Sequence, residues 1–205
     1  HLSELGSIPL PPYIREQLDD PERYQTVYSK IMGSVASPTA GLHFTSKLID
    51  QIQKMGVELV FVTLHVGWDS FRTIESDDIT SHKMHSEYWH LGQNQAYVIN
   101  KAKTDGRRVV CVGTTTTRLI EHAATTNKNR TVSISAGSGW TSLFIYPGYR
   151  FRIVDALLTN FHLPKSSLLM LTTAFGGHNL TSRAYSEATH KRYRFYSFGD
   201  AMLIT

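Results

Sequence analysis

The 205-residue sequence predicts an α/β fold, and three observations support this prediction. Apolar, β-branched runs alternate with amphipathic segments along the chain, as in proteins whose helices cover a sheet. Hydrophobic residues make up 41% of the chain and charged residues 19%, which gives enough material for a core and excludes a disordered chain. The length fits one domain. We therefore expect residues 1–205 to form a single α/β domain with a mostly parallel sheet or a partial, distorted (β/α) barrel.

The first third of the chain is expected to run from an extended lead-in through a helix into a strand. The proline-rich opening cannot lie inside a helix, and a short helix is expected within residues 15–31. Thr45 or Ser46 can cap a helix that Gly56 ends. Residues 57–66 are apolar almost throughout, which predicts a strand buried on both faces.

The rest of the chain continues the alternation. In order, the pattern predicts a long loop over 67–87, a helix over 88–103, a strand over 107–113, a helix capped within 114–117 that runs to 123, a polar excursion over 127–139, strands over 141–149 and 151–161, a helix over 168–175 capped by Ser166 or Ser167, and a last helix from Thr181.

Three histidines stand where a predicted strand or extended run ends, and catalytic residues of α/β proteins gather at such ends. They are His43 with Thr39 and Thr45 nearby, His65 with Thr63, and His162 with Asn160 and Asp155. The ordinary histidine pKa of about 6.5 suits general acid or base catalysis near neutral pH. One histidine in such a place is more often structural, so it is the repetition that indicates a site.

The segment VGTTTTR, residues 112–118, joins a strand to a helix through Gly113 and a hydroxyl-rich turn. Free amides and hydroxyls at a helix N-terminus favour an anion, so Thr114, Thr115 and Arg118 could bind a phosphate or a carboxylate. The turn lacks the lysine and glycine spacing of a P-loop. Helix capping alone would also explain it.

Metal binding and membrane insertion find little support in the sequence. His82, His85, His90 and Glu87 match no strong metal motif, so we expect solvated histidines and no metal. The lone Cys111 excludes an intrachain disulfide and a cysteine-rich zinc site. Without a membrane-spanning run or a signal peptide, we expect a soluble, cytoplasmic protein.

Charge is distributed unevenly along the chain. Residues 1–100 carry 7 Lys and Arg against 12 Asp and Glu, whereas residues 101–205 carry 14 against 5. Near the C-terminus, Lys191, Arg192 and Arg194 alternate with aromatic residues. Such a pattern suits contact with single-stranded RNA, because cations pair with phosphates and aromatic rings stack on bases. A solvated basic face and a half-buried strand are the simpler alternatives.

Taken together, several segments resemble one family, the S-adenosylmethionine:tRNA ribosyltransferase-isomerases of queuosine biosynthesis. The resemblance covers nearly the whole chain, in the family's order. Its blocks are RYQTVYS at 23–29, SPTAGLHFT at 37–45, TLHVG at 63–67, HKMHSE at 82–87, VGTT at 112–115 with Arg118, FIYPGY at 144–149, VDALLTNFHLPKSSLLML at 154–171 and YRFYSFGDAMLI at 193–204.

The resemblance implies that the ribosyl portion of S-adenosylmethionine, the co-substrate, moves onto 7-aminomethyl-7-deazaguanine at the tRNA wobble position. Rearrangement gives epoxyqueuosine, with release of adenine and methionine. It implies no metal or redox cofactor, and we expect a monomer.

We assign roles to residues in these blocks, and to Arg192 just before the last one, as follows. The catalytic candidates are His43, His65 and His162 as proton carriers and Asp155 as a group that orients a histidine or faces a cation. Candidates for binding S-adenosylmethionine are Thr39, Gly41, Phe44, Thr63, Gly113, Thr114, Thr115, Arg118, Asn160 and Phe161. Candidates for contacting RNA are Lys165, Arg192, Tyr193 and Arg194.

The sequence departs from the family's pattern in two ways. Family members are longer, so the resemblance implies that this chain lacks the family's inserted β-rich domain and the first part of the α/β domain. Trp68, Asp69 and Ser70 also stand where the family has a small glycine-threonine stretch, and a tryptophan there would reshape a pocket. Two alternatives stay open: a portion that binds the tRNA anticodon loop without catalysis, and an enzyme acting on a phosphorylated sugar.

Overall fold

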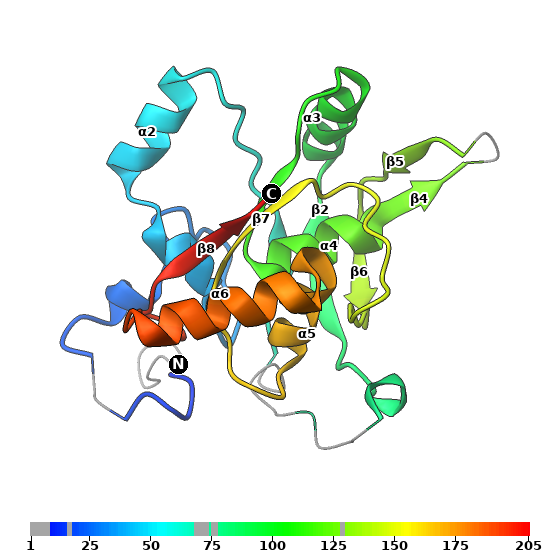
Figure 1. Ribbon diagram of the computed structural model, residues 1–205. Coiled ribbons are helices and arrows are strands. Elements are labelled where there is room, and N and C mark those ends of the chain that lie inside the picture. The colour runs from blue at the N-terminus through cyan, green and yellow to red at the C-terminus, as the bar shows by residue number, and fades with distance from the viewer. Residues whose placement is uncertain (1–8, 16–17, 68–73, 75–77, 128–129) are drawn as a thin grey trace.

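Strands and helices alternate in the computed structural model, which describes residues 9–15, 18–67, 74, 78–127 and 130–205 (Figure 1). The α-helices are α2 (Ser46–Lys54), α3 (Gln93–Thr104), α4 (Thr114–Ala123), α5 (Ser167–Gly176) and α6 (His178–His190). The strands are β1 (Thr63–His65), β2 (Glu87–Leu91), β3 (Val110–Val112), β4 (Ala124–Thr126), β5 (Val132–Ile134), β6 (Gly137–Thr141), β7 (Ala156–Asn160) and β8 (Ala201–Ile204). Short 3-10 turns are η1 (Pro21–Tyr24), η2 (Thr39–His43) and η4 (Ile79–Ser81).

The α/β class is confirmed, but the expectation of a mostly parallel sheet is wrong. Within the described residues the strands form three small sheets, ordered β1-β2-β6, β3-β7-β8 and β4-β5. The only parallel pair among them is β3 with β7. The sequence alternation gave the order of the elements, whereas pairing depends on long-range packing that periodicity does not report.

Three predicted elements differ from the structure. Residues 57–66 were expected to form one buried strand, but only Thr63–His65 pair as β1, and Val57 and Phe61 are about half exposed. The expected helix over 88–103 begins with strand β2, whose residues 87–91 pair on both sides, and continues as α3. The expected strand over 141–149 is displaced, because β6 lies in the Gly/Ser-rich stretch before it.

The N-terminal helix expected within residues 15–31 is, in its described part, only the 3-10 turn η1, which starts at Pro21.

The helix caps agree better with the sequence prediction. The Thr45 hydroxyl accepts a hydrogen bond from the Leu48 amide at 3.1 Å, and the Ser166 hydroxyl accepts one from the Leu169 amide at 3.1 Å. Each satisfies an amide that the first helical turn leaves without a partner.

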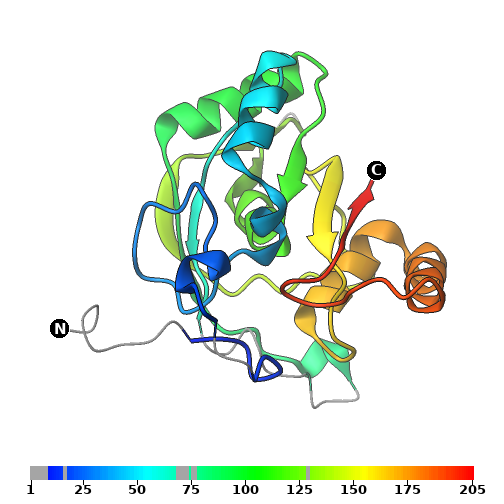
Figure 2. The same ribbon diagram turned by 90° about the vertical axis from the view of Figure 1, so that its left-hand side faces the viewer.

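A core forms around α4, which packs between β3 and the β1-β2-β6 sheet. Leu119 and Ile120 of α4 are essentially inaccessible, and Trp89 and Leu91 of β2 join the same apolar cluster. Cys111 of β3 is also buried there, and burial raises the pKa of its thiol to about 12. A smaller cluster of Ile145, Leu157 and Leu171 joins β7 to α5. Figure 2 shows α5 and α6 on one side, away from α2 and α3.

Helix α2 covers an apolar groove instead of a packed core. None of its residues is buried, and Leu48 and the C-cap residue Met55 are 36% and 80% exposed, although their spacing in the sequence puts both on one apolar face of the helix. The groove measures about 380 Å³ and runs between residues 56–62 and strand β3. Apolar patterning therefore identified the helix, but not how deeply it is buried.

One buried carboxylate ties α4 to the chain that leads into β7. Glu121 is fully inaccessible, and its side chain accepts hydrogen bonds from the amides of Arg152, Ile153 and Val154 at 2.9–3.1 Å. The Tyr149 hydroxyl donates a further bond at 3.2 Å, and the Arg152 guanidinium lies 3.7 Å away. These donors stabilise the charge, which would otherwise be costly to bury.

Glu121→Ala is expected to lower the free energy of unfolding by about 3–5 kcal/mol, because it leaves several buried donors unpaired. Urea titration followed by circular dichroism measures the loss. Glu187→Ala, which removes an exposed i,i+4 partner of Lys191 on α6, is the matched control and should change stability little. Equal, small effects of both substitutions would contradict this role of Glu121.

Candidate functional site

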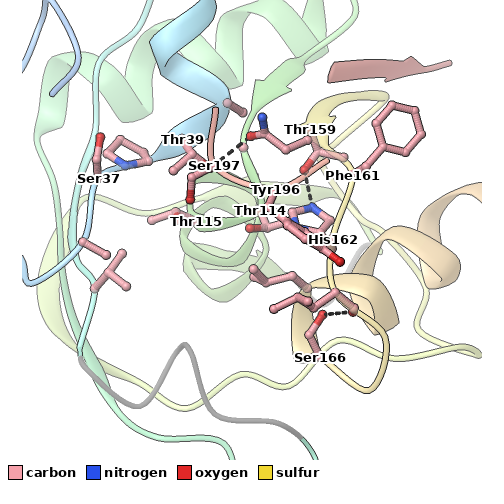
Figure 3. A pocket seen from close by; sticks show the side chains of 18 of the residues that line it. Ser37, Thr39, Thr114, Thr115, Thr159, Phe161, His162, Ser166, Tyr196 and Ser197 are labelled. Atoms are coloured by element: carbon pink, nitrogen blue, oxygen red, sulfur yellow. Dashed lines mark hydrogen bonds between the residues drawn. The ribbon is translucent and has the colours of Figure 1, made fainter. Parts of the chain in front are cut away.

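A cavity of about 100 Å³ lies where β7 ends and α4 begins (Figure 3). Its walls come from residues 36–40, the start of α4, the segment 159–163 that ends β7, and the turn at Tyr196 and Ser197. Gly113 and Leu158 hold the two elements together, because the Gly113 amide donates to the Leu158 carbonyl at 2.8 Å. The carboxyl end of a strand and the amino end of a helix thus meet at one opening, as the sequence predicts.

A polar network crosses this cavity from η2 to β7. Asn160 is 1% exposed, and its carbonyl oxygen accepts a hydrogen bond from the Thr39 hydroxyl at 3.0 Å. Its amide nitrogen lies 3.4 Å from His43 Nε2 and 3.5 Å from the Gly199 carbonyl oxygen. Thr39 and Asn160 therefore line the cavity, while His43 is an exposed residue joined to its wall through Asn160.

His162 is the histidine that enters the cavity wall. It is 9% exposed, and burial lowers the pKa of its imidazole to about 4, so the ring is neutral at pH 7. Its Nε2 shares a 2.7 Å hydrogen bond with the Thr159 hydroxyl, and its backbone amide donates to the Tyr185 hydroxyl at 2.8 Å. Among the described residues Nδ1 has no hydrogen-bond partner. A neutral ring with one nitrogen held and the other unengaged can exchange a proton with a ligand.

The start of α4 presents hydrogen-bond donors to the same cavity. Gly113 is the N-cap, with φ of 88° and no side chain to cap the helix. Thr114 and Thr115 follow it and line the cavity, as does Arg118 one turn later. Uncapped amides at a helix N-terminus carry partial positive charge and favour an anion. The Thr114–Thr117 run therefore lies inside the helix, instead of capping it as the sequence suggested.

Arg118 is held by two groups inside the protein. Its Nε donates to the Leu143 carbonyl at 3.1 Å, and its Nη1 pairs with Glu87. Both side chains are buried, at 6% and 2% exposure. Glu87 also accepts a hydrogen bond from the Gly67 amide at 3.3 Å. The positive charge of Arg118 is thus compensated within the wall of the cavity.

Several predicted site residues lie elsewhere. His65 does not line the cavity; its ring stacks on Tyr88 with centroids 5.9 Å apart. Thr63 lies two residues before it in β1. Gly41 is packed against Tyr28, and Phe44 lines the apolar groove. Of the three histidines only His162 lines the cavity, because His43 and His65 belong to other elements, η2 and β1, and β1 lies in a different sheet from β7.

Asp155 is also separate from the cavity. Its carboxylate accepts bonds from Lys103 Nζ at 2.7 and 2.8 Å and from the Val109 amide at 2.8 Å. It faces a cation, one of its two expected roles, and contacts none of the three histidines. The pair ties α3 to the start of β3 and β7.

Phe161 lines the cavity, but its ring points away from His162 in Figure 3. The ring packs against Tyr185, Tyr193 and Phe195, with centroids 5.2, 6.0 and 5.0 Å away. This aromatic cluster joins β7 to α6 and to the C-terminal turn. Tyr193 is therefore partly engaged in packing, although it remains 47% exposed.

The cations expected to contact RNA are exposed. Lys165 and Arg192 both lie in turns with positive φ, 55° and 57°, and Tyr196 of the cavity wall has φ of 71°. Arg194 pairs with Asp200 at 3.3 Å, and the Arg194 amide donates to the same carboxylate, which holds the Asp200 pKa below its usual value. Residues 191–200 form turns and not a half-buried strand.

The cavity includes residues that the sequence did not single out. Glu87 was named only as a metal ligand that the sequence did not favour, and Ser37, Tyr13, Tyr196 and Ser197 were not assigned to the site. Tyr13 and Ser197 share a 2.7 Å hydrogen bond, and burial raises the Tyr13 pKa. Apart from Tyr13, all of them fall within the sequence blocks at 37–45, 82–87 and 193–204, which was the available signal.

Within the described residues, no three His, Cys, Asp or Glu side chains are arranged to hold a metal ion. None of the helices described is both long and apolar enough to cross a membrane. Trp68, Asp69 and Ser70, which depart from the family pattern, lie outside the described residues.

The known proteins that this chain resembles come from one enzyme family. A model of the family described as "Queuosine biosynthesis protein" matches residues 1–204. The chain is 57% identical over 203 residues to the S-adenosylmethionine:tRNA ribosyltransferase-isomerase of Symbiobacterium thermophilum and 55% identical to that of Clostridioides difficile strain 630. Each alignment covers 99% of this chain and 58% of the relative.

A solved structure agrees with this relationship. The crystal structure of S-adenosylmethionine tRNA ribosyltransferase from Thermotoga maritima matches with a TM-score of 0.65 at 42% identity, over 82% of this chain and 51% of that one. The chain thus spans a little over half the length of the relatives it matches. With its family match extending from residue 1 to residue 204, the chain belongs to the queuosine biosynthesis protein family.

Proposed function

We propose that this chain forms the part of an S-adenosylmethionine:tRNA ribosyltransferase-isomerase that binds S-adenosylmethionine and carries out ribosyl transfer. The acceptor is 7-aminomethyl-7-deazaguanine at the tRNA wobble position. The aminomethyl nitrogen of the base gains the ribosyl carbons as the C–S bond to methionine and the glycosidic bond to adenine break, so that one S-adenosylmethionine gives adenine, methionine, one proton and epoxyqueuosine in the tRNA. The observation that carries the proposal is the cavity in which neutral His162 faces the donor-rich start of α4.

The chemistry needs a base, because the sulfonium makes the adjacent ribose 5′ protons acidic, and an acid to assist the departure of adenine. His162 fits the base, since its ring is neutral at pH 7 and its Nε2 is held by Thr159. His43 is our candidate for the second proton carrier, because it contacts Asn160 at the cavity wall and is exposed. A neutral polar wall also tolerates the positive sulfonium better than a second free cation would.

The cavity is smaller than sites that enclose a whole ligand, which usually measure about 300–1,000 Å³. At about 100 Å³ it fits a portion of S-adenosylmethionine. The tRNA with its deazaguanine would approach from the side of Lys165 and residues 192–194. There, exposed cations can contact its phosphates and Tyr193 can contact its nucleobases. A reducing, cytoplasmic location is consistent with Cys111, which is a buried free thiol.

The central experiment incubates the chain with S-adenosylmethionine and tRNA carrying the deazaguanine precursor, and follows adenine release and tRNA mass. We expect His162→Gln to lower the rate by about 10² or more, because it removes the proton acceptor. His190→Ala, an exposed histidine at the end of α6, is the control and should retain the rate. Salt-dependent tRNA binding without any adenine release would favour the alternative of a binding portion that does not catalyse.

The neutral state of His162 has its own pH signature. The folded-state pKa, about 4, lies below the ordinary value of 6.5, so protons bind the unfolded chain more tightly. The stabilisation is complete above pH 6.5 and is lost as pH falls toward 4, by about 3 kcal/mol in all. Urea titrations at several pH values should show a smaller decline for His162→Gln. Parallel curves for both proteins would contradict a neutral, buried His162.

The proposed RNA contacts predict a change in salt dependence. Lys165→Gln and Arg192→Gln should each weaken tRNA binding and reduce the slope of log K against log salt by about 0.7–0.9, because each removes one phosphate contact. Lys101→Gln is the control, since Lys101 pairs with Asp105 on the exposed face of α3. Binding isotherms at several salt concentrations measure the slopes. Slopes that match the control would remove these residues from the RNA contact.

A further inference from the structure

The donor-rich end of the cavity contains a buried nitrogen, Arg118 Nη2, without a hydrogen-bond partner in the part of the chain that the structure describes. Of the three nitrogens of the Arg118 guanidinium, Nε and Nη1 bind Leu143 and Glu87, whereas Nη2 is buried and has no hydrogen-bond partner among the described residues. The Arg118 side chain is 94% buried and lines the cavity. Leaving a charged donor unpaired in the interior costs free energy, so a ligand that binds Nη2 recovers it.

The first turn of α4 places further donors beside this group. Arg118 stands four residues after Thr114, so both lie on one face of the helix. The amides of Thr114 and Thr115 have no acceptor within the helix, because the first bond is from the Thr117 amide to the Gly113 carbonyl at 3.2 Å. Amides without an acceptor among the described residues, with a guanidinium edge on the same face of the helix, suit the binding of an oxyanion.

The charges around this subsite decide which oxyanion fits. Glu87 pairs with Arg118 inside the wall, so their formal charges cancel, and the net attraction comes from the helix N-terminus, roughly half an elementary charge. That suits a singly charged carboxylate. A phosphate, with more charge and more oxygens, would bring negative charge near buried Glu87 without enough compensation. The small cavity favours the same choice, because it has room for a fragment.

Resting on the function proposed above, we propose that Thr114, Thr115 and Arg118 Nη2 bind the carboxylate of the methionine portion of S-adenosylmethionine, and that Glu87 is a positioning residue for Arg118. Glu87 holds the guanidinium through Nη1 and so leaves Nη2 for the ligand. The carboxylate anchor fixes the amino-acid end of the co-substrate within the same cavity as His162. The subsite thereby distinguishes S-adenosylmethionine from analogues that lack a carboxylate.

The test compares S-adenosylmethionine with its decarboxylated analogue by calorimetric titration of the chain. We expect the wild-type protein to bind S-adenosylmethionine at least about tenfold more tightly, since the analogue leaves the donors unpaired. Arg118→Lys keeps a positive charge beside Glu87 but removes Nη2. It should bring the two affinities close together and leave the affinity for the analogue nearly unchanged.

A second pair of variants tests the helix amides independently. Thr114→Pro removes the first amide of α4 at a position where helices tolerate proline, and Thr114→Ala keeps that amide. Only the proline variant should lose discrimination between the two ligands. Circular dichroism confirms that each variant folds.

The outcomes separate this inference from the proposed function. Equal wild-type affinities for the two ligands, or unchanged discrimination in both Arg118→Lys and Thr114→Pro, would overturn the carboxylate site while S-adenosylmethionine binding and adenine release still supported the function. If inorganic phosphate competes with S-adenosylmethionine more strongly than methionine does, the subsite binds a phosphate, and the carboxylate site is overturned as well. Failure of S-adenosylmethionine to bind at all would overturn both.

Discussion

The site depends on the way Glu121 anchors helix α4. Its carboxylate accepts hydrogen bonds from the amides of residues 152–154, just before β7. The C-terminal end of α4 is therefore fixed to the start of that strand. At the other end of the helix, the Gly113 amide binds the Leu158 carbonyl in β7. Helix and strand are therefore tied at both ends. The donors of Thr114 and Thr115 keep a fixed position relative to Thr159, Asn160 and His162, which a binding site needs.

The cavity combines strong hydrogen-bonding groups with little net charge. Arg118 is neutralised by Glu87, and His162 is neutral because it is buried. The proposed co-substrate, a zwitterionic sulfonium, would be bound in such a site through directed donors and acceptors rather than through a strong overall field. The site also leaves the unprotonated ring of His162 in a place with little water.

The sequence predicted several local features of the fold and some of the residues that line the cavity. Thr45 and Ser166 were recognised as helix caps because capping depends on neighbouring residues alone. The strand that contains β7 and the helix α4 were both predicted, and Asn160, His162 and Thr114 line one cavity, although β7 is shorter than expected and Gly113 caps α4 in place of the threonines. What the sequence did not give is which strands pair. His65 was grouped with His162 because both end apolar runs, but β1 pairs with β2 in a different sheet.

Glu87 illustrates why some of the site could not be predicted. In the sequence it stands in a polar stretch rich in histidines, which is typical of a solvated loop. Its burial follows from the approach of Arg118, 31 residues away, and a single sequence does not report such a contact. The exposure of α2 could not be predicted for a similar reason. The sequence pattern indicates that a helix has an apolar face, but it does not indicate what covers that face.

Lys165 and Arg192 both have positive φ angles, so a glycine substitution at either turn would have two opposite effects. A left-handed backbone costs most side chains about 1–2 kcal/mol and costs glycine almost nothing. Glycine at either position would relax the turn and remove the cation in the same step. At these two residues a relaxed backbone and a positive charge are therefore mutually exclusive. The protein has the charged side chain and the strained backbone conformation.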